Sequence, residues 1–138
     1  MDVLFLIGRI LFVGIFLGSA MGHLRNTDAM AGYAESRGVK PARPLTLITG
    51  VQIAVGALLV LLGIWIDVGL ILLALFLIPT AVLMHAFWKE TDAMAKQMEQ
   101  IQFMKDLALA GASIALLAAV WMLGGDLDLT ITDPLFNP

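Results

Sequence analysis

Four long apolar runs alternate with shorter polar segments along this chain. The runs cover residues 3–21, 45–66, 68–88 and 103–123. Each is close to the length of about 20 residues that an α-helix needs to cross the hydrocarbon core of a bilayer. The pattern therefore predicts an all-α fold, a four-helix transmembrane bundle with up-down topology. Residues 1–123 would form this membrane domain, and residues 124–138 would form an acidic tail.

The connections after the first and third runs are expected to carry short interfacial helices. In residues 26–39, Asn26 or Thr27 can cap a helix that ends at Gly38 in the left-handed conformation. In residues 89–102, apolar side chains repeat at the spacing of an amphipathic helix: Met94, Met98 and Ile101. Such a helix suits the interface between lipid and water. A functional lid and a simple elbow explain this second connection equally well.

The composition supports a membrane protein. The chain has 138 residues, of which 60% are hydrophobic and 14% charged, whereas soluble domains average about half apolar and a quarter charged residues. This length leaves no room for a soluble catalytic domain beside the bundle. A net charge of −3 without a basic patch does not favour nucleic-acid binding. No basic segment precedes the first run, so we expect a retained helix and not a signal peptide.

The positions of Lys and Arg predict the orientation in the membrane. The cations of the polar connections all follow the first or the third run: Arg25, Arg37, Lys40, Arg43, Lys89 and Lys96. Because Lys and Arg in short loops favour the cytoplasmic side, both termini are expected outside the cytoplasm. The acidic tail is then expected to be an extended, solvated segment on the outer side.

Cysteine is absent from the sequence. This excludes thiol nucleophiles, disulfide exchange and cysteine-ligated iron–sulfur centres. No zinc motif, phosphate-binding loop or nucleophile triad is present either, so we predict no metal site. Any redox chemistry would need a borrowed cofactor or a diffusible carrier.

Polar residues inside the runs or at their ends are candidates for function, because a charged group at the bilayer centre costs several kcal/mol. Up-down topology brings most of them to the cytoplasmic end, as ligand-binding candidates: His23, Gln52, His85, Gln102, Lys105 and Asp106. Gln52 lies about two turns deeper than the others. A lysine is unfavourable at the positive end of a helix, which indicates an anion or a carboxylate close to Lys105.

Arg9 forms a second polar level. It lies about 21 Å from His23 along the first helix, toward the outer side. Two interpretations fit it equally well: contact with a ligand, or a side chain that extends to the outer interface.

The two histidines could ligate a haem between helices. Without a cofactor motif the pattern argues against haem, and hydrogen bonds at helix ends are the favoured interpretation for each histidine. A stripe of Gly14, Gly18 and Gly22 allows a neighbouring helix to approach closely. Whether that helix belongs to the same chain or to a homo-oligomer is left open.

The ordered set of these positions resembles the DoxX family of small bacterial and archaeal membrane proteins. The resemblance runs to about Leu123 and is carried by Arg9, Gly22-His23, Tyr33 with Gly38 and Pro41, Gln52 with Gly56, His85-Ala86-Phe87-Trp88, and Gln102-Phe103-Met104-Lys105-Asp106-Leu107-Ala108. It implies a four-helix bundle in the cytoplasmic membrane. The same polar positions, with Arg9, are the site residues that it implies.

The resemblance also implies a function. Relatives include the small membrane subunit of a thiosulfate:quinone oxidoreductase and proteins tied to oxidative and sulfur stress through partner enzymes. This chain would then be a subunit of a redox complex that handles a quinone or a sulfur compound at the polar cluster. The alternative is a non-catalytic accessory subunit that stabilises a membrane complex or binds lipid. A transporter is a third reading and would require a dimer.

Overall fold

The computed structural model describes residues 2–136 and is helical in nearly all of them up to residue 126. Its α-helices are α1 (Asp2–Arg25), α2 (Thr27–Ser36), α3 (Ala42–Leu62), α4 (Ile66–Met84) and α5 (Ala93–Leu123), with short 3-10 turns η1 (Phe87–Lys89) and η2 (Gly124–Asp126). Four of these helices, α1, α3, α4 and α5, are long and apolar enough to cross a membrane. The predicted all-α, four-helix fold is confirmed.

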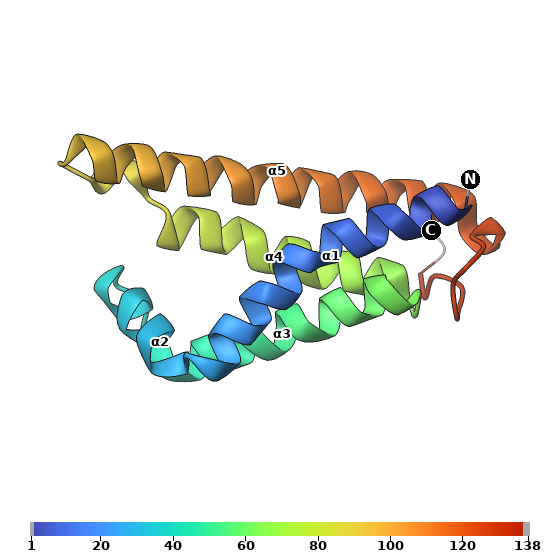
Figure 1. The fold of residues 1–138 in the computed structure, drawn as a ribbon, viewed down its shortest axis with the longest axis horizontal. Helices are drawn as coiled ribbons and strands as arrows, with labels where there is room; N and C mark the ends of the chain where they lie inside the picture. Colours follow the sequence, from blue (N-terminus) through green and yellow to red (C-terminus); the bar gives the residue numbers. More distant parts are fainter. Residues whose placement is uncertain (1, 137–138) are drawn as a thin grey trace.

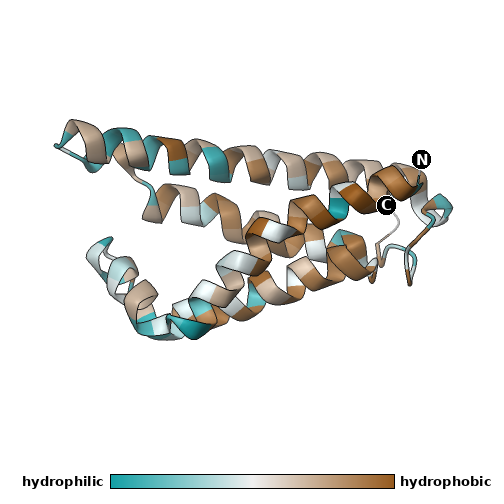
Figure 2. Cartoon of the chain, in the orientation of Figure 1, coloured by the Kyte–Doolittle hydropathy of each residue, from teal (hydrophilic) through white to brown (hydrophobic). Residues whose placement is uncertain are grey.

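The four long helices run up and down and pack in chain order. Helix α1 lies against α3, α3 against α4, and α4 against α5. The described chain begins and ends at one end of the bundle, which we call the termini end (Figure 1). The opposite end, which we call the connection end, carries α2 and the segment between α4 and α5. Apolar residues dominate the middle of the bundle, and hydrophilic residues gather at the two ends (Figure 2).

Small residues allow the central helices to approach closely. A Cβ atom added at Gly69 of α4 would lie 2.8 Å from the carbonyl oxygen of Gly56 on α3. Around this contact Ile53, Leu70 and Leu73 are almost completely buried. By contrast, large apolar side chains on the outer surface stay exposed, such as Leu11 with 74% of its surface accessible. This arrangement suits a bundle whose outer face contacts lipid.

The two connections differ from each other. Helix α2 forms as predicted, and Gly38 has the expected left-handed conformation (φ 86°). Asn26 makes no capping hydrogen bond through its side chain, and the Thr27 hydroxyl donates to the carbonyl oxygen of His23 at 2.7 Å instead.

The prediction of a separate interfacial helix in residues 89–102 is wrong. Helix α5 begins at Ala93, where the Asp92 side chain caps it by accepting from the Ala95 amide at 2.8 Å. It then continues unbroken to Leu123. The predicted amphipathic pattern is the exposed face of its first turns, because no glycine or proline between Ala93 and Asp106 interrupts the helix.

The second and third spans also have different bounds from those predicted. Helix α3 ends at Leu62 because Gly63 takes a left-handed conformation (φ 71°), which stops the helix. Helix α4 therefore starts earlier, at Ile66, and ends at Met84. His85 is consequently the residue after the helix and not part of it.

The tail folds back over the α3–α4 turn and is not a freely solvated segment. The amides of Ile131 and Thr132 donate to the carbonyl oxygen of Gly63 at 2.8 and 3.0 Å. The amides of Leu135 and Phe136 donate to the buried carboxylate of Asp67 at 3.0 and 2.7 Å. A charge-assisted hydrogen bond is stronger than a neutral one, so Asp67 fixes the tail to the termini end.

Candidate functional site

A cavity of about 380 Å³ lies inside the connection end. Its walls come from all five α-helices and from the residue that follows α4. All but one of the predicted ligand-binding candidates line it: His23, Gln52, His85, Lys105 and Asp106. Gln102 does not line it, but its side-chain oxygen accepts a hydrogen bond from Lys105 Nζ at 2.5 Å. The fold thus brings together residues that are far apart in the sequence, from position 23 to position 106.

The deeper part of the cavity is apolar with a few polar groups. His23 Nδ1 lies 2.8 Å from the carbonyl oxygen of Ser19. Since a carbonyl oxygen only accepts, Nδ1 carries the proton in this contact. The ring of His23 meets Phe76 edge to face, with 5.8 Å between the ring centres. Gln52 donates through Nε2 to the carbonyl oxygen of Leu72 at 2.9 Å, so its amide is held across the α3–α4 contact.

His85 lies between two carboxylates of α5. Its Nδ1 is 2.7 Å from Glu99 Oε2, and its Nε2 is 3.7 Å from Asp106 Oδ2. Asp106 is 4% exposed, and its other oxygen lies 3.4 Å from Lys105 Nζ. The carboxylate expected close to Lys105 is therefore its own neighbour in sequence. This chain of contacts leads from the protein surface at Glu99 to the wall of the cavity at Asp106.

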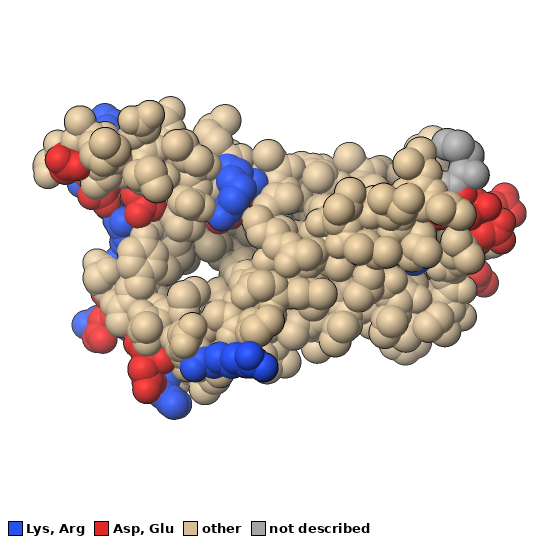
Figure 3. All heavy atoms as spheres, viewed as in Figure 1, with Lys and Arg blue, Asp and Glu red and all other residues tan. Residues whose placement is uncertain are grey.

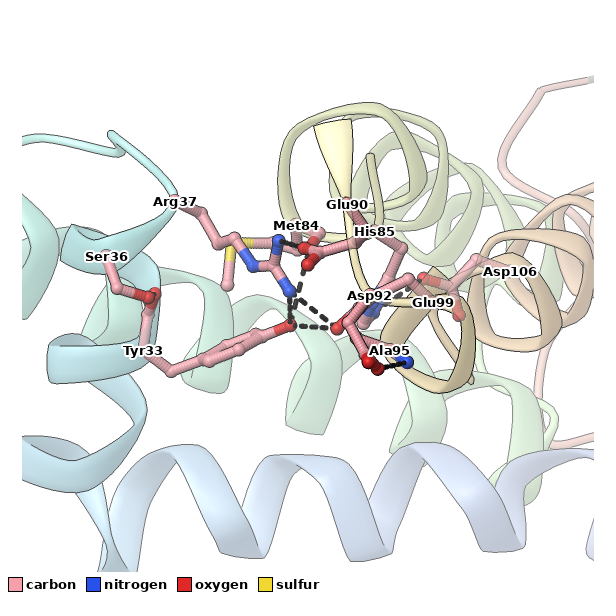
Figure 4. A network of polar contacts seen from close by, with 10 residues as sticks. All are labelled: Tyr33, Ser36, Arg37, Met84, His85, Glu90, Asp92, Ala95, Glu99 and Asp106. Atoms are coloured by element: carbon pink, nitrogen blue, oxygen red, sulfur yellow. Dashed lines mark hydrogen bonds and ion pairs between the residues drawn. The ribbon is translucent and has the colours of Figure 1, made fainter. Parts of the chain in front are cut away.

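Glu99 also joins α5 to α2. Its Oε1 accepts from the Tyr33 hydroxyl at 2.8 Å and from Arg37 Nη2 at 2.6 Å. Arg37 forms a further ion pair with Glu90 and donates to the Tyr33 hydroxyl at 3.0 Å. The side chains of α2 and those of the α4–α5 segment point toward one another in Figure 4. Together these contacts link the two sides of the connection end next to the cavity.

The network shifts the ionisation of its α2 members. Burial, followed by the hydrogen bond to Glu99, raises the pKa of Tyr33 above its usual value. The hydrogen bond to Glu90 is the main cause that raises the pKa of Arg37. Tyr33 therefore stays a neutral donor and Arg37 stays a cation at physiological pH.

The space-filling view shows the entrance region. The connection end is hollowed between two groups of charged side chains, whereas the middle of the molecule is almost free of charge on this face (Figure 3). The hollow provides a polar mouth to a cavity whose inner walls are mostly apolar.

Sequence reasoning missed four members of this network: Tyr33, Arg37, Glu90 and Glu99. Tyr33 entered only among the residues that carry the family resemblance, and Arg37 only as a topology signal. The signal that could have found them is the presence of opposite charges in the two connections, which up-down topology places at the same end. Their distance in sequence hid the pairing, since Arg37 and Glu99 are 62 residues apart.

Arg9 does not belong to this site. It lies at the termini end and is 4% exposed, so the protein itself covers nearly all of its side chain. Its Nη2 donates to the carbonyl oxygen of Leu129 in the tail at 2.6 Å. Its Nε and Nη1 are buried without a hydrogen-bond partner.

The arrangement suits the binding of a small amphipathic molecule. Ligand pockets commonly have volumes of about 300–1,000 Å³ with apolar walls and a few polar groups. Among residues 2–136, no group of three or more His, Asp or Glu side chains is placed to hold a metal ion. The cavity offers hydrogen-bond donors from Lys105 and Gln52 and an acceptor from Asp106.

Comparison with known proteins agrees with the resemblance noted in the sequence. The family model described as DoxX matches residues 4–86, which cover α1 to α4. The chain is 31% identical over 115 residues to the inner membrane protein YphA of Escherichia coli strain K12. The aligned residues cover 83% of this chain and 81% of that protein. No solved structure matches the chain.

Proposed function

This chain belongs to the DoxX family of multi-pass membrane proteins, and from that premise we propose that it is the membrane subunit of a redox complex that binds a quinone at the connection end. The observation that carries the proposal is the cavity of about 380 Å³ with a carboxylate–histidine chain in its wall. The electrons come from a partner enzyme that oxidises a sulfur compound, as the family resemblance implies, and the chain itself has no cysteine for thiol redox chemistry.

The residues of the cavity fit a quinone. The side chains of Leu75, Phe76 and Leu83 line the cavity and provide apolar contacts for the ring and its tail. Lys105 and Gln52 can donate hydrogen bonds to carbonyl oxygens at opposite depths of the cavity. A haem fits less well, since both nitrogens of His85 already face carboxylates.

The protein residues supply and guide protons. A quinone, when bound, takes up two electrons and two protons and leaves as the quinol. Glu99 receives protons at the mouth, His85 transfers them through its ring, and Asp106 delivers them to the cavity wall. Lys105 next to Asp106 stabilises negative charge that develops on an oxygen atom of the ligand. We propose, from the positive-inside rule, that this mouth faces the cytoplasmic side, where protons and soluble partners are available.

The alternative is an accessory subunit that stabilises a membrane complex without taking part in its chemistry. The outer face of α1 favours it, because a Cβ atom added at Gly14, Gly18 or Gly22 would meet nothing within 4 Å. Such an open stripe of small residues is available to a helix of a partner. The two functions differ in whether the polar side chains of the cavity, such as His85 and Lys105, take part in the reaction.

Substitution in the cluster separates these two functions. The complex is purified in mild detergent from cells that carry the wild type, His85→Gln or Lys105→Ala, and partner enzymes are identified by mass spectrometry. Quinol formation is then followed spectroscopically with a short-chain quinone. The redox function predicts normal partner levels and a loss of quinol formation of about 100-fold or more, as is typical when a positioned proton donor is removed.

The matched control is Arg43→Gln. Arg43 pairs with Asp28 at the same end of the bundle, but both side chains are mostly exposed and neither belongs to the cluster. It should retain full activity. Unchanged quinol formation in both cluster variants would refute the redox function and leave the accessory one.

A further inference from the structure

A second cavity lies at the termini end and shares no residue with the first one. Its volume is about 580 Å³, and its walls come from α1, the end of α3, the start of α4, the end of α5 and the tail. Phe5, Phe12, Leu70 and Leu116 form an apolar part. Charged residues also line it: Arg9, Asp2, Asp126 and Asp128. None of these charged groups takes part in the proposed redox chemistry.

Arg9 is the unexplained group in this cavity. The side chain is buried, yet only Nη2 has a hydrogen-bond acceptor, the carbonyl oxygen of Leu129. Nε and Nη1 have none, and within residues 2–136 no carboxylate forms an ion pair with the guanidinium. The ring of Phe5 lies 5.4 Å from the guanidinium carbon and offsets part of the cost. A buried cation with free donors is costly unless it is paired, and an anionic oxygen would both neutralise the charge and accept from the free donors.

The depth of Arg9 matches the lipid headgroups. Arg9 is seven residues from the start of α1 at Asp2, which is about 10 Å along the helix axis. Helix α1 is long enough to exceed the hydrocarbon core of about 30 Å. The guanidinium therefore lies close to the boundary between hydrocarbon and headgroups on the side of the termini. Arginine binds phosphate oxygens well, because its fork of N–H groups matches them.

We propose that this cavity binds phosphatidylethanolamine. The phosphate accepts hydrogen bonds from Arg9, the ammonium group lies against Asp126 and Asp128, and the acyl chains lie along Phe12 and Leu116. The pairing of a buried cation with exposed carboxylates in one cavity selects a headgroup that carries both charges. The carboxylates repel a lipid with net negative charge, such as phosphatidylglycerol. The methylated ammonium of phosphatidylcholine has no N–H group to donate to them.

The experiment uses the full chain in detergent with an equimolar mixture of the three phospholipids, and native mass spectrometry counts those that stay bound. We expect the wild type to retain phosphatidylethanolamine about tenfold over the other two. Arg9→Gln should reduce that binding about tenfold, which corresponds to the loss of one charge-assisted hydrogen bond. Arg43→Gln, at the opposite end, should bind lipid like the wild type.

Two further variants separate binding from folding. Arg9→Gln also removes the bond to the tail, so Thr132→Ala, which loosens the tail only at the Trp65 amide, should keep the lipid. Asp126→Asn with Asp128→Asn changes exposed side chains and should remove the preference for phosphatidylethanolamine even if Arg9→Gln fails to fold.

Three results would overturn the assignment. The first is equal retention of the three lipids by the wild type, or a preference for phosphatidylglycerol. The second is a preference that survives the double Asp→Asn change. The third is a loss in Thr132→Ala as large as that in Arg9→Gln, which would assign the effect to the tail. The cavity at the termini end shares no residue with the cavity of the proposed redox function. Lipid binding can therefore fail while quinol formation stays intact, and quinol formation can fail while lipid binding stays intact.

Discussion

Glu99 holds the connection end closed, and replacing it with glutamine tests that role. The carboxylate has contacts with Tyr33, Arg37 and His85, from α2 and from the segment after α4. Glutamine keeps the size and one acceptor oxygen, but it loses the charge. Its NH₂ group faces either Tyr33 and Arg37, whose donors it cannot accept, or His85, which can accept from it only with the ring proton on Nε2; in both orientations the contacts lose the negative charge of the carboxylate.

The size of the effect follows from the burial of the pair. The side chains of Glu99 and Arg37 are 15% and 18% exposed, so solvent screens their interaction only in part. A hydrogen bond with a charged group contributes about 1.5–3 kcal/mol, and a neutral one about 0.5–1.5 kcal/mol. A loss of about 1 kcal/mol at each of these contacts gives a destabilisation of about 2–4 kcal/mol, and Glu90 limits it by retaining Arg37.

The assay has a global and a local readout. Unfolding in mixed micelles measures the free energy of unfolding, and hydrogen–deuterium exchange measures opening of α2. We expect the loss of about 2–4 kcal/mol together with faster exchange in residues 27–36. Glu35→Gln is the matched control, because Glu35 is an exposed carboxylate of α2 without a side-chain partner among the described residues. A free energy of unfolding within about 0.5 kcal/mol of the wild type, or unchanged exchange in α2, would refute this role.

Two further predictions concern Tyr33 and the helix contacts. Tyr33 is the single tyrosine, so ultraviolet difference absorbance should show its ionisation above the usual pKa of about 10, with a smaller shift in Glu99→Gln. Because folding raises the pKa of Tyr33, the stability that its neutral hydroxyl contributes is present below about pH 10 and is lost as the pH rises through the raised pKa. A titration midpoint of Tyr33 at or below pH 10 would contradict the raised pKa. Gly69→Ala should destabilise by about 1–3 kcal/mol because its Cβ atom meets the Gly56 carbonyl, whereas Gly18→Ala should be tolerated in thermal unfolding; equal effects would contradict the packing described.

Part of the candidate site could be predicted from the sequence. Polar residues are rare in apolar runs, so His23, Gln52 and Asp106 stand out, and up-down topology puts them at related depths. The charged residues of the connections do not stand out, since charge is ordinary there. Glu99 was read as the polar face of an interfacial helix. Only the continuation of α5 beyond the membrane turns that face toward α2.

At Arg9 the sequence marks the residue but does not reveal its contact with the tail. The sequence marks Arg9 as unusual because a cation in an apolar run is costly. It does not show that the tail returns to cover it, because the acceptor is a backbone carbonyl, that of Leu129, which any residue provides. Asp67 separates the second and third apolar runs in the sequence, and nothing in that position shows that its carboxylate fixes the tail.

The sequence by itself determined the number of spanning helices, their up-down order and the end at which the polar residues gather. These follow from hydrophobic length and from the cost of charge in lipid, which act locally along the chain. The tertiary structure decided which side chains meet, that a cavity lined by the polar candidates lies at the connection end and another beside Arg9 at the termini end, and that Arg9 is buried with two unpaired nitrogens. Those outcomes depend on helix rotation and close approach at positions such as Gly56 and Gly69, where packing across distant segments selects one arrangement.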